Sequence, residues 1–441
     1  MDSFKITGGF SLNGEIKVGG AKNVAIKALI ASLLTDEDVV IENVPLISDL
    51  YLLSDIVKSL GVKIDINNNH TMTINAKNLF PGELSPHIFS KLRASFLLIA
   101  PLLARFKEAK IPFPGGDDIG VRPIDRTISG LKSLGAKIEF REDHYLASCR
   151  ELIGSKYYFN KNTHTGTEAL MMAATLSYGE TVLENAAAEP EVDELIKMLK
   201  SMGAKIKRTA ERTIVIYGVK KLKGTHFKII PDRNEIVTFA IAAILTRGEL
   251  NIYPVIEAHL ESFYQELSKI GVDFKQKNNI LTVNGSKRPI FAGNIETAPY
   301  PLFMTDWQAP WCLLMTQAKG VSVVWEKVFE NRFGYVNELK KMGAAIELFN
   351  PKIKNPNKIY NFNWKENLPF LSAAKIIGPT LLHGENLLIP DLRAGATLVL
   401  AAMAAQGESH ILGVNHIDRG YEKFEERLNQ VGAKITRLTV L

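Results

Sequence analysis

The chain has 441 residues, of which 46% are hydrophobic and 23% charged, a composition typical of a soluble globular protein with two or three domains. Its 53 Lys and Arg residues against 47 acidic residues give a net charge of +6, which is too mild to imply a nucleic-acid partner and suits a small anionic ligand equally well. No run of about twenty apolar residues appears and the N-terminus lacks the apolar core of a signal peptide, so we expect a cytosolic protein with no nucleic-acid or membrane partner.

The first predicted element is a strand at residues 15–18, followed by two glycines and an apolar helix at residues 25–34. A glycine pair before a helix N-terminus offers free backbone N–H groups and the positive end of the helix dipole, which suit a phosphate or carboxylate. Lys22 adds a full positive charge. The Gly-Lys-Ser/Thr order of a nucleoside-triphosphate loop is missing, so a structural turn is the competing interpretation.

A glycine-rich loop at residues 114–123 carries two adjacent carboxylates, Asp117 and Asp118, and ends with Arg122 before a proline. Glycine allows positive φ angles and the close approach of backbone to a ligand. Taken alone, this loop fits a turn between two strands with solvated carboxylates better than a ligand site.

A short phrase centred on a glycine recurs six times along the chain, at residues 61, 135, 203, 271, 343 and 432. Each glycine follows an amphipathic helical pattern and precedes a pattern typical of strands. Residues 191–199 have apolar side chains at i, i+3, i+4 and i+7, which predicts a helix capped by Gly203 in the left-handed conformation. A second, uniformly apolar helix is predicted earlier in each repeat, as at residues 170–176 and 239–245, and should be buried on all sides.

The repeat predicts six βαβαββ copies of about 70 residues, grouped three to a domain because one copy alone cannot bury both of its helices. We expect the strand within residues 1–20 to complete the last domain, so that the chain crosses twice between domains. One domain then comprises residues 22–231, including a loop at 112–123, and the other comprises residues 1–21 with 232–441. The polar, proline-bearing stretch 350–358 predicts a surface loop.

Arginines recur at the boundaries of the predicted elements. A guanidinium fork matches carboxylate and phosphate oxygens, although each arginine could instead pair with a neighbouring acid. Together they predict a polyanionic ligand between the domains. These arginines are Arg93, Arg122, Arg233, Arg332, Arg393 and Arg419.

Asp306 lies just ahead of an apolar helical run, where a carboxylate is either the helix N-cap or a general base at a domain edge. The two cysteines, Cys149 and Cys312, have neither the paired spacing of a zinc site nor that of a disulfide framework. We expect both to be buried and chemically inert.

Taken jointly, several phrases of the chain are highly specific. They are Gly19-Gly-Ala-Lys-Asn23, Arg93-Ala-Ser95, Pro114-Gly-Gly116 with Ile119-Gly-Val-Arg-Pro-Ile-Asp125, Glu184-Asn-Ala-Ala187, Pro231-Asp-Arg233, Thr305-Asp306, Val328-Phe-Glu-Asn-Arg-Phe333, Asp391-Leu-Arg-Ala394 and His416-Ile-Asp-Arg-Gly-Tyr421. Through them the chain resembles the enolpyruvyl transferases of the EPSP synthase-like family, and within that family the UDP-N-acetylglucosamine 1-carboxyvinyltransferases. The resemblance implies an α/β fold of two domains, an inside-out α/β barrel in which three βαβαββ repeats per domain surround buried helices, with the active site in the cleft between the domains.

The resemblance also implies an activity. The enolpyruvyl group of phosphoenolpyruvate would pass to the 3′-hydroxyl of UDP-N-acetylglucosamine through a tetrahedral intermediate, with release of phosphate, as the first committed step of peptidoglycan synthesis. No metal or redox cofactor and no obligate protein partner are expected. The alternatives are a paralogue that binds a sugar nucleotide without catalysis, and a 3-phosphoshikimate 1-carboxyvinyltransferase, although the asparagine-alanine-glycine-threonine loop typical of that branch is missing.

Individual residues receive roles from the same resemblance. Lys22, Arg122 and Arg419 would hold the phosphate and carboxylate of phosphoenolpyruvate, with Arg393 close by. Asp306 would be the base near the sugar hydroxyl, Asn23 would orient the sugar, and Asp117 would deliver a proton from a mobile lid. The other substrate-binding residues that the resemblance implies are Arg93, Asp125, Lys161, Thr165, Gly166 and Val328.

The chain departs from the commoner family pattern at several positions. Many relatives carry a cysteine at the lid tip, where this chain has Asp117. A carboxylic acid can donate a proton if its pKa is raised by burial or by the adjacent Asp118. Either Asp117 or Asp118 could be the proton donor. The pair at residues 126–127, the loop at 161–168 and the stretch near 350–390 also differ, which leaves the preferred sugar nucleotide open.

Overall fold

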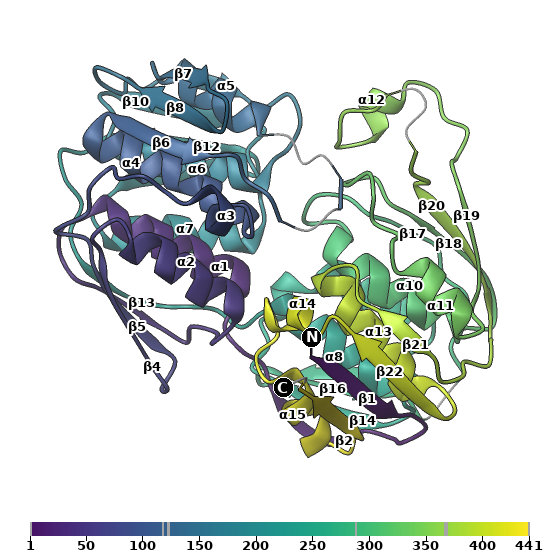
Figure 1. Cartoon of the computed structure of the whole chain (residues 1–441). Coiled ribbons are helices and arrows are strands. Elements are labelled where there is room, and N and C mark those ends of the chain that lie inside the picture. The colour runs from purple at the N-terminus through teal and green to yellow at the C-terminus, as the bar shows by residue number, and fades with distance from the viewer. Residues whose placement is uncertain (1, 117–118, 121–123, 287–288, 366–368, 440–441) are drawn as a thin grey trace. The chain divides into compact units, whose positions relative to one another are not determined.

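The computed structural model describes residues 2–116, 119–120, 124–286, 289–365 and 369–439 (Figure 1). The chain divides into two compact units. Unit 1 comprises Met1–Gly19, Asp117–Arg122 and Pro231–Leu441, and unit 2 comprises Gly20–Gly116 and Pro123–Ile230. The expected domains, 22–231 and 1–21 with 232–441, differ from these units by one or two residues at each crossing and in the placement of residues 117–122.

Unit 2 contains three sheets. Their strands are β3 (Val39–Glu42), β4 (Lys63–Asn67), β5 (Thr71–Asn75), β6 (Glu108–Pro112), β7 (Lys137–Phe140), β8 (His144–Ser148), β9 (Lys156–Tyr158), β10 (Glu180–Glu184), β11 (Lys205–Ala210), β12 (Thr213–Tyr217) and β13 (Thr225–Lys228). The strand orders are β13-β3-β5-β4, β6-β8-β7 and β11-β12-β10-β9. Only β13 with β3 and β9 with β10 are parallel pairs among these strands.

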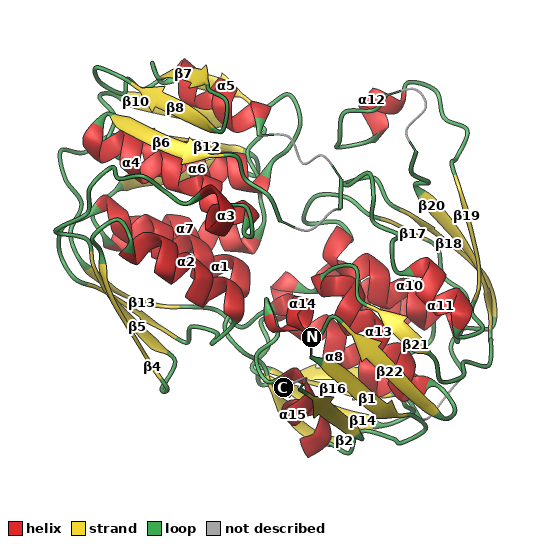
Figure 2. Ribbon diagram, viewed as in Figure 1, coloured by secondary structure: helices red, strands yellow, loops and turns green. Residues whose placement is uncertain are grey.

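The helices of unit 2 lie between its sheets (Figure 2). The inner set is α1 (Lys22–Ala31) with its extension η1 (Ser32–Leu34), η2 (Arg93–Leu98) with α4 (Ile99–Phe106), and α6 (His164–Ala174). The outer set is α2 (Ser48–Lys58), the short α3 (Pro86–Phe89), α5 (Asp125–Ser133) and α7 (Pro190–Ser201). The inner helices are mostly apolar on every side, and residues 24–34 and 166–174 are buried without interruption, including the charged residues Lys27 and Glu168. The outer helices bury one face and expose charged residues on the other.

Unit 1 also contains three sheets. Their strands are β1 (Ser3–Thr7), β2 (Asn13–Lys17), β14 (Glu249–Tyr253), β15 (Asp273–Lys277), β16 (Ile280–Asn284), β17 (Ile295–Glu296), β18 (Gly320–Trp325), β19 (Ala345–Phe349), β20 (Ala373–Gly378), β21 (Asn386–Leu388), β22 (Glu408–Leu412) and β23 (Ile435–Leu438). The strand orders are β15-β16-β14-β2, β17-β18-β20-β19 and β21-β22-β1-β23.

Three buried helices form the inside of unit 1: α8 (Arg233–Leu245), α10 (Gln308–Thr316), which follows the 3-10 turn η4 (Thr305–Trp307), and α13 (Leu392–Ala404). Every residue of α8 and α10 is buried. The other helical elements are η3 (Glu257–His259), α9 (Glu261–Lys269), α11 (Val336–Lys341), α12 (Pro356–Ile359), α14 (Asn415–Asp418) and α15 (Phe424–Gln430). No helix in the described part of the chain is both long enough and apolar enough to cross a membrane.

Two strands are exchanged between the repeats where the chain passes from one unit to the other. β2 precedes α1 but pairs with β14 of unit 1, whereas β13 precedes α8 but pairs with β3 of unit 2. At the crossings, the Asp232 amide donates to the Gly19 carbonyl oxygen at 2.9 Å, and the Ala21 amide donates to the Ile230 carbonyl oxygen at 2.8 Å. The N-terminal strand β1 lies between β22 and β23 and so supplies the last strand of the sixth repeat.

The predicted repeat is confirmed in its glycines, because all six of them have positive φ angles between 84° and 110°. Three local details depart from a regular repeat. At the turn before β14 the left-handed residue is Arg247; Gly248 is required there because a Cβ atom would lie 1.8 Å from the Leu12 carbonyl oxygen. Within the described residues the second repeat has the 3-10 turn η2 where a first strand was expected, and residues 350–358 include the start of α12.

Candidate functional site

The predicted site residues lie at the starts of helices in both units. In unit 2, Lys22 begins α1, Arg93 begins η2, Asp125 begins α5, and Gly166 lies in the first turn of α6. In unit 1, the corresponding positions are held by Asp306 in η4 and by residue 393 in the first turn of α13. Helix N-termini present N–H groups and a positive dipole end, so this arrangement favours an anionic ligand.

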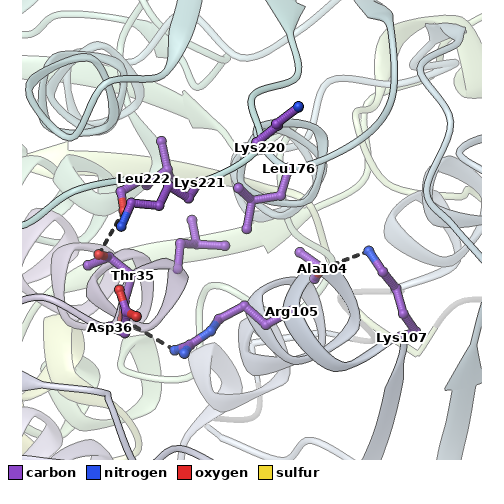
Figure 3. A pocket seen from close by; sticks show the side chains of 10 residues that line it. Thr35, Asp36, Ala104, Arg105, Lys107, Leu176, Lys220, Lys221 and Leu222 are labelled. Atoms are coloured by element: carbon purple, nitrogen blue, oxygen red, sulfur yellow. Dashed lines mark hydrogen bonds between the residues drawn. The ribbon is translucent and has the colours of Figure 1, made fainter.

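A cavity of about 310 Å³ marks the opposite ends of the inner helices in unit 2 (Figure 3). It is lined by residues at the ends of η1, α4 and α6, including Thr35, Arg105, Lys107 and Leu176. Arg105 Nη1 donates to three main-chain carbonyls, and Lys107 Nζ donates to the Ala104 carbonyl at 3.0 Å. These cations therefore offset the partial negative charge of helix C-termini.

The segment around Gly19 differs from expectation in one respect. The Gly19 amide donates to Glu235 Oε2 at 2.9 Å, so it is not a free group for ligand binding. Gly20 is required because a Cβ atom would lie 1.8 Å from the Asn43 carbonyl oxygen. Lys22 Nζ forms an ion pair with Asp49 Oδ2 at 2.7 Å, and both side chains are largely buried. This pair fixes the lysine at the start of α1.

A buried ionic group that the sequence did not reveal lies behind the same helix starts. Lys27 Nζ lies 3.4 Å from Glu168 Oε2, and His164 Nε2 lies 3.1 Å from Glu168 Oε1. Burial and the charge of Lys27 both lower the pKa of His164. The carboxylates of Glu168 and Glu189 raise it by more, so the pKa of His164 is raised overall. The sequence signal was a lysine inside the otherwise apolar helix α1.

The loop that leads into α6 is held by two residues that depart from the family pattern. The Thr163 hydroxyl caps the helix by accepting from the Gly166 amide at 3.2 Å. The buried Arg126 donates to the Asn162 carbonyl at 3.1 Å, so the departures near residues 126 and 161–168 contact each other. Thr165 is exposed at the helix start, and Lys161 is half-buried beside it.

Arg93 and Asn23 occupy the same end of unit 2. Arg93 Nη1 donates to the Pro114 carbonyl at 3.3 Å, and burial lowers the pKa of this arginine. The side chain of Asn23 is half-buried in the first turn of α1, and Asp125 is exposed at the start of α5. Arg93 therefore anchors the beginning of the glycine-rich loop.

In unit 1, Asp306 is the centre of a cluster of cations. Its carboxylate accepts from Arg332 Nη2 at 2.8 Å and from Arg393 Nη2 at 3.4 Å. Asn234 Nδ2 lies 3.5 Å from the same carboxylate, and Asn234 Oδ1 accepts from Trp307 Nε1 at 2.9 Å. The N-cap alternative for Asp306 is wrong, because Trp307 occupies the N-cap position of α10 and no side chain caps that helix.

The two arginines at Asp306 are buried and remain charged. Burial opposes the charge of Arg332, but Asp391 and Asp306 outweigh it and raise the pKa of the guanidinium. Arg393 also donates to the Tyr421 hydroxyl at 3.1 Å. The carboxylate of Asp391 caps α13 by accepting from the amides of residues 393 and 394. The Asp306 carboxylate is thus oriented from several sides.

Glu326 was not anticipated from the sequence, although its carboxylate accepts three hydrogen bonds close to Asp306. Its Oε1 accepts from the amides of Val328 and Phe329 at 2.8 and 3.0 Å, and its Oε2 accepts from the Thr305 hydroxyl at 2.9 Å. The only sequence signal was a lone acid directly after the apolar strand β18.

Three further predicted residues complete the account. Arg419 follows α14 as its C-cap residue and is half-buried. Asp117 and Arg122 lie outside the described residues. Between them, the Ile119 carbonyl accepts from the Asn331 amide at 3.3 Å, and a Cβ atom on Gly120 would lie 2.1 Å from Glu330 Oε2.

Comparison with known proteins identifies the family of the chain. The family model described as EPSP synthase (3-phosphoshikimate 1-carboxyvinyltransferase) matches residues 6–428. The UDP-N-acetylglucosamine 1-carboxyvinyltransferase 2 of Prochlorococcus marinus is 43% identical over 97% of this chain and 96% of that protein. UDP-N-acetylglucosamine 1-carboxyvinyltransferases of Koribacter versatilis and Desulfatibacillum aliphaticivorans are 42% and 39% identical, each over 99% of this chain and over 97% and 100% of their own lengths.

Solved structures of low sequence identity share the fold. The enolpyruvyl transferase NikO from Streptomyces tendae matches with a TM-score of 0.87 at 23% identity, covering 100% of this chain and 99% of that chain. An EPSP synthase from Acinetobacter baumannii matches with a TM-score of 0.71 at 17% identity, covering 100% of both chains. These likenesses confirm the expected α/β fold with inner helices and outer sheets. On its sequence and its fold, the chain belongs to the EPSP synthase family of enolpyruvyl transferases.

Proposed function

We propose that this protein transfers the enolpyruvyl group of phosphoenolpyruvate to the 3′-hydroxyl of UDP-N-acetylglucosamine and releases phosphate, the first committed step of peptidoglycan synthesis. Relatives at about 40% identity over nearly their whole length bear the name of this activity. The observation on which the proposal chiefly rests is the carboxylate of Asp306, held by Arg332 and Arg393 at the start of an inner helix. Such a base beside cations suits a reaction between a hydroxyl group and a polyanion.

The chemistry assigned to these residues is addition followed by elimination. Asp306 takes the proton of the sugar hydroxyl, whose oxygen bonds to C2 of phosphoenolpyruvate while the methylene carbon gains a proton from Asp117 or Asp118. The tetrahedral intermediate then loses a methyl proton and phosphate, which restores the double bond. Lys22, Arg122, Arg393 and Arg419 balance the charge of the phosphate and carboxylate throughout.

The remaining predicted residues are assigned to substrate binding. Asn23 and Val328 contact the sugar. Arg93 binds near the glycine-rich loop. The nucleotide contacts Asp125, Lys161, Thr165 and Gly166, of which Thr165 and Gly166 lie in the first turn of α6 and Asp125 begins α5.

A single assay separates this function from its alternatives. The protein is incubated with phosphoenolpyruvate and either UDP-N-acetylglucosamine or shikimate 3-phosphate, and phosphate release is measured. Release with the sugar nucleotide alone supports the proposal, whereas release with shikimate 3-phosphate assigns the other branch. No release with either acceptor, together with calorimetric binding of UDP-N-acetylglucosamine, identifies a non-catalytic paralogue.

The proton donor is resolved by two matched variants. Asp117→Asn should abolish turnover while leaving nucleotide binding largely intact, because an amide cannot donate a proton to carbon at neutral pH. Asp118→Asn is the matched variant, and it should lower turnover at neutral pH without abolishing it, because the loss of its charge lowers the pKa of Asp117. Full activity of Asp117→Asn would remove Asp117 from the mechanism.

A further inference from the structure

Glu326 is a fully buried carboxylate whose two oxygens serve two different segments of unit 1. Oε1 receives the amides of Val328 and Phe329, and Oε2 receives the hydroxyl of Thr305. A buried charge is costly unless it is fully hydrogen-bonded, and three donors meet that requirement here. The role of Glu326 is therefore to hold the groups that donate to its carboxylate in place.

The first segment that Glu326 contacts contains Thr305, which is connected to Asp306 through Arg332. Because the Thr305 hydroxyl hydrogen points to Glu326 at 2.9 Å, the lone pairs of its oxygen face Arg332 Nε at 3.4 Å. Arg332 Nη2 then donates to Asp306 at 2.8 Å. Arg332 thus donates on both sides, to Asp306 and to Thr305, and the Thr305 hydroxyl donates in turn to Glu326, so the Glu326 carboxylate sets which face of Thr305 meets Arg332.

The second segment is the turn at residues 328–329. Its two amides bond to one carboxylate oxygen, so the turn is fixed relative to Glu326 and not only to its own neighbours. Glu326 is in turn fixed by the sheet, since its amide donates to the Ser372 carbonyl at 2.8 Å directly after β18 pairs with β20. Burial raises the pKa of Glu326, while Arg332 and the three donors oppose that rise.

We propose that Glu326 is a positioning residue that fixes two parts of the acceptor site at once, namely the base Asp306 through Thr305 and Arg332, and the backbone at Val328 directly. The inference rests on the proposed function, in which Asp306 and Val328 face the sugar. Glu326 itself touches no reacting atom. Its loss should therefore alter both turnover and affinity for the sugar nucleotide, without altering affinity for phosphoenolpyruvate.

The test uses two variants with separable effects. Thr305→Val removes only the branch to Asp306, and it should lower kcat about tenfold to a hundredfold with little change in the KM for UDP-N-acetylglucosamine. Glu326→Gln weakens both branches, because an amide is a poorer acceptor for the two backbone N–H groups and places a donor against Thr305. It should lower kcat to a similar degree and also raise the KM for UDP-N-acetylglucosamine about three- to tenfold.

Glu296→Gln is the matched control, because Glu296 is an exposed carboxylate of β17 that bonds to Lys327 at 2.6 Å, next to Glu326 in the chain. It should behave as the wild type. Wild-type kcat and KM in Glu326→Gln would overturn the inference, and so would an equal rise in the KM for phosphoenolpyruvate. If Glu326→Gln does not fold, Thr305→Val decides alone, and unchanged kcat in that variant overturns the inference. Wild-type protein that releases no phosphate with this acceptor would instead overturn the proposed function.

Discussion

Arg332→Lys is the substitution whose effect on unit 1 follows most directly from the geometry. Arg332 uses separate nitrogens for separate partners: Nη2 lies 2.8 Å from Asp306, Nε lies 3.4 Å from Thr305, and Nη1 lies 3.7 Å from Asp391. A lysine ammonium is a single point of charge and cannot reach all three. At least one of these three partners therefore loses its contact with residue 332.

The magnitude can be worked from these contacts. A hydrogen bond to a charged group contributes about 1.5–3 kcal/mol, and the lower part of that range applies because Arg393 still contacts Asp306. A loss of about 2 kcal/mol lowers the melting temperature of a unit of this size by about 4–8 °C. If the same energy is lost from the transition state through a misplaced Asp306, kcat falls roughly 30-fold.

Tryptophan fluorescence gives a melting curve specific to this unit. All four tryptophans, Trp307, Trp311, Trp325 and Trp364, belong to unit 1. Arg141→Lys is the control, since Arg141 is an exposed residue of unit 2 that pairs with Glu139, and it should change neither melting nor phosphate release. A melting temperature within 1 °C of the wild type for Arg332→Lys, together with unchanged kcat, would show that Arg332 does not support Asp306.

Two further outcomes are expected, one from the reactivity of the two cysteines and one from the protonation of His164. Epoxides and iodoacetamide should cause no time-dependent inactivation. Burial raises the pKa of the Cys149 thiol, and it raises the pKa of the Cys312 thiol to about 12, so little reactive thiolate is present. Covalent inactivation would contradict this expectation. The pKa of His164 is raised above 6.5, so its protonated form stabilises unit 2 fully below that pH and the contribution is lost as pH rises through the raised value. The melting temperature of the wild type, followed by circular dichroism, should therefore exceed that of His164→Gln most at pH 6 and least at pH 9, and a constant difference would refute the ionic role of Glu168.

The fold could be predicted largely because local signals repeat. Six glycines in one phrase require a left-handed backbone, and uniformly apolar helices can only be interior, so the order of elements follows from short stretches of sequence. The exchange of β2 and β13 is different, since each pairs with a strand that is far away in the sequence. The strand patterns of the two are alike, and nothing local selects the partner.

The sequence pointed to candidate site residues but not to the bonds that they form. It left Asp306 as either a cap or a base, and the arginines that contact its carboxylate, Arg332 and Arg393, lie 26 and 87 residues away in the chain. The amide of Gly19 was expected to be free, yet Glu235 reaches it from 216 residues away. Contacts of this kind arise only when the inner helices pack together, so no spacing rule in the sequence reports them.

The position of β1 has a consequence for how the protein is made. This strand is synthesised first, but its two neighbours, β22 and β23, include the last strand of the chain. Unit 2 has all of its strands once residue 228 has left the ribosome, whereas the N-terminal segment must wait for about two hundred more residues. Synthesis therefore imposes an order in which unit 2 folds first. A chain that stops before residue 435 leaves one edge of β1 unpaired, and such an open edge invites aggregation.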